Sequence, residues 1–371
     1  MEQNYFFYLP FALFLIALFC TNIFQNMDRA KQITGLAKLG NFFKSFLDKN
    51  PEQFDNDQEE LSAILRRSET ENPWFTQENQ RFALKQWANL LTEENLENWL
   101  QHYQVSKFSK KVGLILAGNI PMVGFHDVIS VVFSNHIPVI KLSSKDRWIL
   151  PFILKKWNEL SEGNVDYELV EKLEIFDAVI ATGSNNTARY LEYYFKNKLS
   201  IIRKNRTSIA VLKGDETDEE LQLLSEDIFR YFGLGCRNVT RILIPEDFKI
   251  DRLFENFLHF KDIINHHKYA NNYDYNRAVY LLNMEQFWDN NFVMLKEDEK
   301  LFSPLSVINF SRYKNIEEVQ KFIEENEQDI QAVVAKPDLV IEGSVGLGEA
   351  QNPSLDTYAD HVDTMKFLEV I

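Results

Sequence analysis

The sequence predicts an α/β protein built on a parallel β-sheet that helices cover on both faces. Two observations support this class. From Lys111 onward, short apolar runs alternate with stretches of helical periodicity. The runs are almost continuously apolar, which is typical of strands that are buried on both faces. Alternation of this kind is the pattern of strand–helix–strand units in a parallel sheet.

The individual elements follow from this alternation in chain order. Apolar runs predict strands at Val112–Ala117, Pro138–Leu142, Ile175–Ala181, Leu199–Ile202, Ile209–Leu212 and Val239–Ile244. Helical periodicity between them predicts helices at Asp127–Ser134, Lys145–Ser161, Asn185–Phe195 and Asp218–Phe232. After an irregular stretch, a second alternation predicts a strand, a helix and a strand at Leu305–Phe310, Ile316–Glu325 and Ile330–Ala335.

The chain before the alternating region reads differently. Residues 27–110 carry apolar stripes at helical spacing, which predicts a helical N-terminal region. Residues 1–26 include the uncharged run Tyr5–Phe24, which is about long enough to cross a bilayer. Two interpretations stay open, a retained membrane anchor or an over-called start with translation from Met27. A cleaved signal peptide is disfavoured because no Lys or Arg precedes the run.

Composition limits the classes of partner and the compartment. The 371 residues include 55 acidic and 40 basic side chains, a net charge of −15. Such a surface repels phosphate backbones, so no nucleic-acid partner is expected. The two cysteines, Cys20 and Cys236, exclude a disulfide framework, and we expect a reducing, cytoplasmic location. Membrane contact is expected only if residues 5–24 are translated.

Cys236 is the candidate nucleophile. It lies in the segment Tyr231–Val239, between a predicted helix and a predicted strand, with Gly233 and Gly235 shortly before it. Glycines permit close backbone approach and unusual dihedral angles, and Arg237 next to the thiol can stabilise a thiolate. The alternative is a buried structural cysteine, which is a common fate of a free thiol.

Polar residues follow three of the predicted strands, at the edge where parallel α/β sheets bind ligands. Asn119, in a Gly-Asn-Ile-Pro turn after the first strand, has an amide that could donate to an oxyanion. The candidate residues for holding a phosphate-bearing cofactor at the other two strand ends are Lys141, Ser143, Ser144, Thr182, Gly183 and Ser184. Each of these turns also suits a simple helix start.

No metal site is predicted. The adjacent His266 and His267 should have diverging side chains on regular structure. The sequence places no other cluster of metal-binding residue types beside them, so a zinc site is not expected.

The order of these motifs resembles the aldehyde dehydrogenase superfamily over residues 110–336. In that superfamily the Asn of the first turn helps to form the oxyanion hole, and the Lys-x-Ser segment holds the adenosine end of the cofactor. The Gly-Ser pair lies near the pyrophosphate, and the Cys is the nucleophile. The segment Lys300–Leu305 resembles a further motif, Glu-x-Phe-Gly-Pro. The resemblance implies a parallel-sheet cofactor-binding domain and a smaller α/β catalytic domain.

Within the superfamily, the context of Cys236 and the closing segment Tyr358–Thr364 resemble the LuxC-like acyl-CoA reductases. Two departures from the superfamily pattern are visible. Around Arg203–Thr207, no Glu stands where aldehyde dehydrogenases carry the residue that activates water. Lys300 replaces a Glu that holds the nicotinamide ribose, and whether the neighbouring Glu299 substitutes for it stays open.

The resemblance therefore implies reduction of a fatty acyl-CoA thioester to the aldehyde through an acyl-Cys236 intermediate, with NADPH as reductant and NADH as the alternative. Expected partners are long-chain acyl-CoA or another acyl thioester, and a homo-oligomer is left open. The implied domains are residues 111–235 for the cofactor and 236–336 for catalysis, with residues 337–371 returning to the core. The rivals are an acyltransferase or thioesterase that uses the same acyl-Cys step, and a degenerate membrane-attached scaffold without activity.

Overall fold

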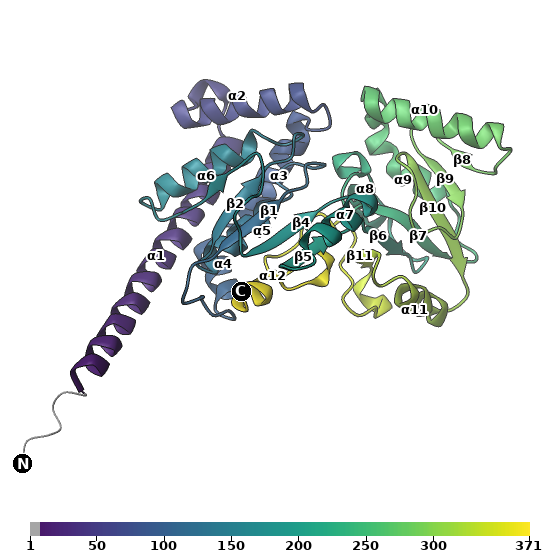
Figure 1. The fold of residues 1–371 in the computed structure, drawn as a ribbon. Helices are drawn as coiled ribbons and strands as arrows, with labels where there is room; N and C mark the ends of the chain where they lie inside the picture. Colours follow the sequence, from purple (N-terminus) through teal and green to yellow (C-terminus); the bar gives the residue numbers. More distant parts are fainter. Residues whose placement is uncertain (1–7) are drawn as a thin grey trace, which may run out of the picture.

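The computed structural model describes the backbone of residues 8–371 and the side chains from Met27 onward (Figure 1). The expectations for the run Tyr5–Phe24 concern side chains outside the described residues. Of the helices that are described, none is both long enough and apolar enough to cross a membrane. The N-terminal region is helical as predicted, with α1 (Tyr8–Asp48), α2 (Asn56–Glu71), α3 (Gln77–Leu90), α4 (Glu93–Leu100) and the short 3₁₀ helix Pro51–Gln53.

A five-stranded parallel sheet follows, in the order β3-β2-β1-β4-β5. Its strands are β1 (Lys111–Ile115), β2 (Ile137–Lys141), β3 (Glu168–Leu169), β4 (Ala178–Thr182) and β5 (Leu199–Arg203). Their connections hold α5 (Phe125–Phe133), α6 (Ile149–Leu160) and α7 (Asn185–Phe195).

The strand order reverses direction between β1 and β4. Because β2 and β3 extend the sheet on one side of β1, while β4 and β5 extend it on the other, right-handed crossovers place α5 and α6 on one face and α7 on the opposite face. A crevice forms at such a switch point, outside the carboxyl ends of the strands, and it is the usual ligand site of an open α/β sheet. The carboxyl ends of β1 and β4 flank this point.

The second part of the molecule is a six-stranded, mostly parallel sheet in the order β11-β6-β7-β10-β9-β8, in which β8 alone runs antiparallel to its neighbour. Its strands are β6 (Thr207–Val211), β7 (Val239–Pro245), β8 (Trp288–Asp289), β9 (Met294–Glu297), β10 (Val307–Tyr313) and β11 (Ile330–Ala335). Its helices are α8 (Asp218–Phe229), α9 (Asp251–Phe257), α10 (His267–Leu282) and α11 (Ile316–Glu325), and the 3₁₀ helices are Arg230–Gly233, Leu258–Asn265 and Pro337–Leu339.

One strand, β6, belongs to a different sheet than we expected. We expected the strand near Ile209 inside the cofactor-binding region of residues 111–235, but β6 pairs with β7 and β11 of the six-stranded sheet. The apolar alternation identifies strands without identifying the sheet that each strand joins. The chain therefore passes to the second sheet directly after β5.

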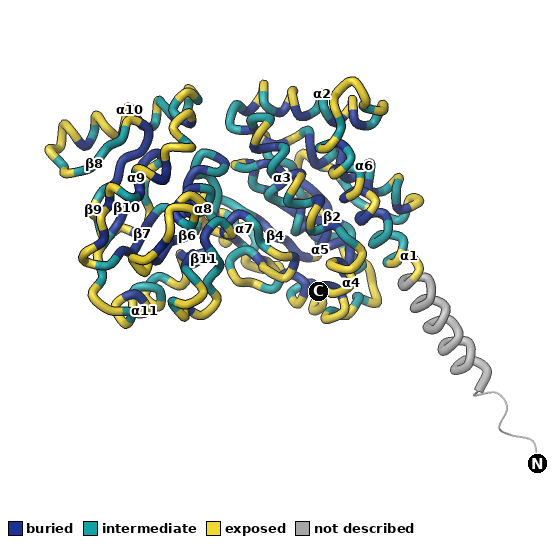
Figure 2. The backbone as a smooth tube through the Cα atoms, turned by 180° about the vertical axis from the view of Figure 1, so that it is seen from behind, coloured by how far each residue is buried: buried dark blue, intermediate teal, exposed yellow. Residues whose placement is uncertain are grey.

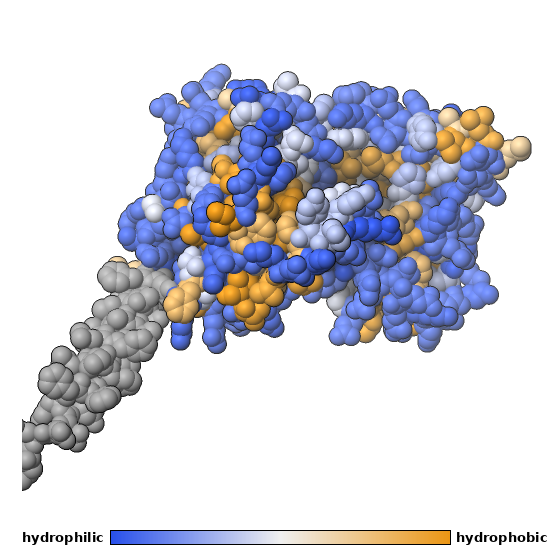
Figure 3. All heavy atoms as spheres, viewed as in Figure 1, coloured by the Kyte–Doolittle hydropathy of each residue, from blue (hydrophilic) through white to orange (hydrophobic). Residues whose placement is uncertain are grey.

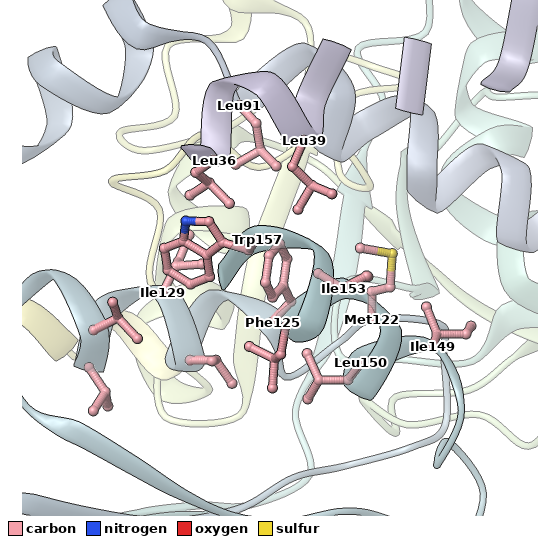
Figure 4. Close-up of a cluster of buried hydrophobic side chains, with 14 of the residues drawn as sticks. Leu36, Leu39, Leu91, Met122, Phe125, Ile129, Ile149, Leu150, Ile153 and Trp157 are labelled. Atoms are coloured by element: carbon pink, nitrogen blue, oxygen red, sulfur yellow. The ribbon is translucent and has the colours of Figure 1, made fainter. Parts of the chain in front are cut away.

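Side-chain caps and apolar packing explain why these segments form their elements. Asp55 and Thr217 each begin a helix with a capping box. The side chain of the first residue accepts from the backbone N–H three positions later, and the side chain at that later position, Gln58 or Glu220, accepts from the backbone N–H of the first residue. In the main core, α1 and α3 pack over α5 and α6, with Trp157 fully buried (Figure 4). Burying one such large apolar side chain stabilises a fold by roughly 1.5–3 kcal/mol.

The C-terminal segment leaves β11 and returns to the five-stranded part, where α12 (Thr364–Glu369) packs on α5 after the 3₁₀ turn Ala359–His361. The imidazole Nε2 atoms of His126 and His136 lie 2.8 Å and 3.0 Å from the carbonyl oxygens of Leu355 and Leu368. Figure 2 shows the same region from behind, with buried backbone between the two parts of the molecule.

The surface is largely hydrophilic in the view of Figure 3. One group of exposed apolar side chains follows the last turn of α10, where Leu282 and Met284 are 81% and 92% exposed.

Candidate functional site

Cys236 is presented by a tight loop with a left-handed backbone between α8 and β7. Tyr231, Phe232 and Gly233 have φ values of 55°, 61° and 77°, and Gly235 has a φ of 102°. A left-handed backbone conformation costs energy in any residue other than glycine, and it persists only where the surrounding structure enforces it. Such clusters of backbone strain are typical of functional sites, and this one ends directly at the candidate nucleophile.

The thiol of Cys236 lies in an enclosed environment between cations and one carboxylate. Burial raises the pKa of the Cys236 thiol, the neighbouring Arg237 lowers this pKa, and Asp360 raises it. The thiol's own backbone N–H and Arg203 lower the pKa by smaller amounts. Arg237 therefore favours the thiolate, whereas burial, which is the larger effect, favours the neutral thiol.

The turn that carries Asn119 lies against the Cys236 loop. A Cβ on Gly235 would lie 3.5 Å from Cδ1 of Ile120, so the two loops lie side by side. Asn119 itself is exposed, and its amide makes no hydrogen bond within the described part of the chain. The side chain is therefore available to a ligand beside the thiol.

The same turn also touches the segment that follows β2. A Cβ on Gly118 would lie only 2.3 Å from Oγ of Ser143, so this position requires glycine. The backbone N–H of Met122 donates to the carboxylate of Asp146 at 3.2 Å. Burial raises the pKa of Asp146 to about 6. The structure thus brings the Asn119 turn, the Ser143 turn and the Cys236 loop together at one edge of the sheet.

The remaining predicted cofactor residues line the carboxyl edge of the sheet. Ile115 pairs with Lys141 on one side and Ala181 on the other, which places Lys141 and Thr182 on either side of β1, at roughly 10 Å from each other. Lys141 is half-buried, and its amine has no hydrogen bond or ion pair to any described residue. Ser144 is exposed.

Three of the predicted residues already have partners within the chain. The Gly183 N–H donates to the carbonyl of Arg203 at 3.1 Å, and Ser184 caps α7 by accepting from the Thr187 N–H at 3.3 Å. Oγ of Ser143 accepts from the backbone N–H of Lys145 at 3.2 Å. Within this edge, Lys141, Ser144 and Thr182 remain the side chains most open to a ligand.

At the end of β5, where the sequence lacks the water-activating Glu, the structure has a buried cation. Arg203 is 6% exposed, and its guanidinium pairs with the buried carboxylate of Asp127 at 2.5 Å and donates to Thr364 at 3.1 Å. Its Nε has no partner in the described part of the chain. The end of β5 therefore carries a buried guanidinium that is paired with a buried carboxylate.

A carboxylate from the C-terminal segment also faces Cys236. Asp360 and His361 both have left-handed φ values, 58° and 57°, and the Asp360 carboxylate lies 3.4 Å from Nε of Arg206. Burial raises the pKa of Asp360, while Arg206 and Arg203 lower it.

Sequence reasoning did not identify Asp127, Arg203 or Asp360 as site residues. A signal existed for the first two, because Asp127 stands alone in a nearly apolar helix and Arg203 ends an apolar strand. No local signal marks Asp360, since its position depends on the return of the C-terminal segment.

The Lys300–Leu305 segment also reaches the Cys236 loop. Leu301 accepts a hydrogen bond from Thr240 at the start of β7, and Ser303, Pro304 and Leu305 line a small cavity of about 30 Å³ together with Gly233 and Asn238. Lys300 and Glu299 are exposed, so neither is fixed as a partner of Cys236.

One expectation about the histidines was wrong. The rings of His266 and His267 do not diverge; they stack, with centroids 5.2 Å apart. The physical reason is that His266 is in an extended conformation just before α10 begins, so the two side chains do not follow helical spacing. In the part of the chain that the structure describes, no group of three metal-binding side chains is close enough to hold an ion.

Comparison with protein-family models gave no match, and neither did comparison with curated protein sequences. Solved structures do match. Aldehyde dehydrogenase 21 from Physcomitrella patens has a TM-score of 0.62 at 12% identity, over 93% of this chain and 84% of that one. P. syringae indole-3-acetaldehyde dehydrogenase, in complex with NAD⁺, has a TM-score of 0.64 at 11% identity, over 92% of this chain and 82% of that one.

A third structural match is an acetylating aldehyde dehydrogenase from Geobacillus thermoglucosidasius. Its TM-score is 0.55 at 11% identity, and 95% of each chain is covered. At these identities the similarity establishes the fold. The chain has the aldehyde dehydrogenase fold that the motifs implied.

Proposed function

We propose that this chain reduces a fatty acyl thioester to the aldehyde, with Cys236 as the nucleophile and NADPH as the reductant. The observation that carries the proposal is the buried Arg203–Asp127 pair at the end of β5. A carboxylate at this position in aldehyde dehydrogenases activates the water that hydrolyses the enzyme thioester. The Arg203 guanidinium cannot act as that base, and the Asp127 carboxylate beside it is engaged in the ion pair, which favours reduction of the acyl-enzyme over its hydrolysis.

The first step transfers the acyl group. Sγ of Cys236 attacks the thioester carbonyl carbon, the carbon–sulfur bond to coenzyme A breaks, and the proton from the Cys236 thiol leaves with the coenzyme A thiolate. The Asn119 amide and the backbone N–H of Cys236 donate to the oxyanion of the tetrahedral intermediate. The proximity of Ile120 to Gly235 supports this role, because the loop with the Asn119 amide and the loop with the Cys236 N–H are neighbours.

The residues of the sheet edge fit a dinucleotide cofactor. Gly118 packs against the Ser143 side chain at the switch point, where a larger residue would clash, and the amine of Lys141 is unpaired among the described residues. A bound nicotinamide cofactor supplies the hydride for the acyl carbon. Cys236 then leaves as a thiolate and takes up one proton, which returns the enzyme to its starting state.

The preference for NADPH rests on the charge near β2. Enzymes that use NAD commonly place an acidic residue on the ribose 2′-hydroxyl, whereas those that use NADP place a cation near the 2′-phosphate. Residues 141–145 contain two lysines and no carboxylate. The next residue, Asp146, is acidic, but its carboxylate is buried and accepts from the backbone N–H of Met122.

The test is incubation of the purified protein with a long-chain acyl-CoA, with and without NADPH, while recording absorbance at 340 nm and the intact protein mass. We expect an acyl adduct without NADPH, loss of that adduct with NADPH, and no adduct on Cys236→Ala. Release of coenzyme A that continues without NADPH would identify a thioesterase or acyltransferase. Acylation of the Cys236→Ala protein would show that another residue is the nucleophile.

A further inference from the structure

The helical region holds an open pocket that the proposed chemistry does not use. α1 and α3 pack against each other (Figure 1), and a cavity of about 440 Å³ lies between them. Its lining residues are Lys44, Leu47, Asp48, Arg81, Phe82, Lys85, Ala88 and Asn89. Three of these side chains are cations and one is an anion, in a chain whose net charge is −15. The pocket is a local positive site on an acidic protein.

The cations of this pocket are available to a ligand. Lys44 and Lys85 are exposed, and their amines make no hydrogen bond or ion pair with any residue from Met27 onward. Other lysines, such as Lys213 and Lys336, pair with two carboxylates each. Arg81 is fixed at the wall, because its guanidinium donates to the carbonyl of Leu47 at 2.9 Å.

The apolar part of the pocket connects it to the loop of the nucleophile. The Phe82 ring meets the Tyr231 ring edge-on with centroids 5.7 Å apart, and the Arg230 guanidinium lies 4.6 Å from the same Phe82 ring. Tyr231 begins the left-handed turn that leads to Cys236. Since Cys236 is five positions after Tyr231, their Cα atoms are at most about 18 Å apart.

We propose that this pocket binds the phosphate-bearing nucleotide end of coenzyme A while the acyl thioester reaches Cys236. The inference rests on the proposed function and adds a second anion site, separate from the cofactor edge at Lys141. Lys44, Arg81 and Lys85 hold the phosphates by charge-assisted contacts, and the Phe82 ring offers an apolar surface to the adenine. The volume lies within the usual range of small-molecule sites.

The length of the carrier agrees with this arrangement. The pantetheine arm between the phosphates and the sulfur has about a dozen bonds of roughly 1.5 Å each, so it reaches on the order of 15 Å. This reach is of the same order as the upper limit of about 18 Å between the Cα atoms of Tyr231 and Cys236.

The binding test uses adenosine 3′,5′-bisphosphate, which carries phosphate without any acyl group, titrated into the full-length protein by calorimetry. Lys44→Glu/Lys85→Glu should weaken binding by at least about tenfold, because two charge-assisted contacts are replaced by repulsion. The matched control is Lys38→Glu/Lys321→Glu, which makes the same charge change at two exposed positions, one of them also on α1. We expect the control to bind as the wild type does.

The kinetic test compares two thioesters of the same acyl chain, one on coenzyme A and one on N-acetylcysteamine, which has no phosphate. In Lys44→Glu/Lys85→Glu, the ratio of kcat/KM for the coenzyme A substrate to that for the truncated substrate should fall about tenfold. Equal loss for both substrates would overturn the inference, since the pocket would then act on stability or on the loop rather than on phosphate.

The two proposals can fail separately. If neither thioester is reduced but the bisphosphate binding depends on Lys44 and Lys85, the reductase proposal is wrong and the anion site stands. If bisphosphate binding is lost in Lys141→Ala and unchanged in Lys44→Glu/Lys85→Glu, the nucleotide binds at the cofactor edge and the inference is wrong.

Discussion

The surroundings of Cys236 and the turn after β2 differ in whether their charged side chains are paired. Around Cys236, Arg203 and Asp127 form a buried ion pair, and Arg237 donates to the carbonyl of Ala350. At the end of β2 and in the turn after it, Lys141 is half-buried and Lys145 is exposed, and neither amine makes an ion pair with the residues from Met27 onward. The same chain therefore fixes one set of charges and leaves the other free.

This difference follows from what each region has to do. A reacting atom benefits from charges and dipoles that are already in place, because no reorganisation is then needed when the transition state forms. A ligand that binds and leaves in every cycle needs charges that are solvated when it is absent, because an unpaired buried charge is costly. Variants in the two regions should therefore fail in different ways.

The largest effect is expected from breaking the buried pair. Asp127→Asn should lower the free energy of unfolding by about 3–5 kcal/mol, since it leaves the Arg203 guanidinium buried without its partner. Chemical denaturation measures this loss. The matched control is Glu192→Gln, which breaks the exposed pair between Glu192 and Lys204 at the neighbouring position of the same strand end. The control should lose less than about 1 kcal/mol, and an equal loss in both variants would remove the contrast between the regions.

The next effect concerns rate and leaves the fold unchanged. Asn119→Ala should lower turnover by roughly 10²–10³-fold, the usual loss when one oxyanion donor is removed, with little change in binding of the acyl-CoA. Steady-state kinetics and a separate binding measurement distinguish the two quantities. Asn41→Ala, at an exposed position of α1, serves as the control. Weaker binding with normal turnover would make Asn119 a substrate anchor.

At the exposed edge we expect an effect on affinity. Lys141→Ala should weaken the binding of NADPH by roughly ten- to a hundredfold, which corresponds to the loss of about 1.5–3 kcal/mol from one charge-assisted contact. NADH should be affected much less, and added salt should narrow the difference in the wild type. Fluorescence titration of both cofactors measures the affinities. An equal loss for NADH and NADPH would show that Lys141 contacts only groups that both cofactors share.

The smallest effect is a pair of opposite shifts in the reactivity of Cys236. Asp360→Asn removes a charge that raises the pKa of the thiol, so this pKa should fall. Arg237→Gln removes a charge that lowers the same pKa, so the pKa should rise. The pH dependence of alkylation by iodoacetamide, measured in a Cys20→Ser background, reports both. Shifts in the same direction would show that the substitutions act through the loop backbone instead of through charge.

These differences also explain which features could be predicted from sequence. Strand and helix positions were predictable because buried parallel strands leave continuous apolar runs, and α7, α11 and β11 have the predicted bounds. The edge residues were predictable because the carboxyl ends of parallel strands share one side. Very short strands such as β3 and β8 carry too few residues to show a pattern.

The electrostatic environment of Cys236 was not predictable in the same way. Arg237 is adjacent in sequence and was identified as a stabiliser of the thiolate. Burial, which raises the pKa of the thiol more than Arg237 lowers it, depends on the packed loop and is not visible in a local pattern. Asp360 reaches the site only because the C-terminal segment returns to it.

That return has a consequence for the order of folding. The indole N–H of Trp99 donates to the hydroxyl of Tyr358 at 2.8 Å across 259 positions of the chain, and α12 covers α5. Contacts so distant in sequence carry a large loop-closure cost and form late. A chain that emerges from the ribosome N-terminus first can assemble the six-stranded part while the five-stranded part still lacks its last helix. The five-stranded part, whose strands are made first, is thus the part that receives its last covering helix only after every strand of the six-stranded sheet has been made.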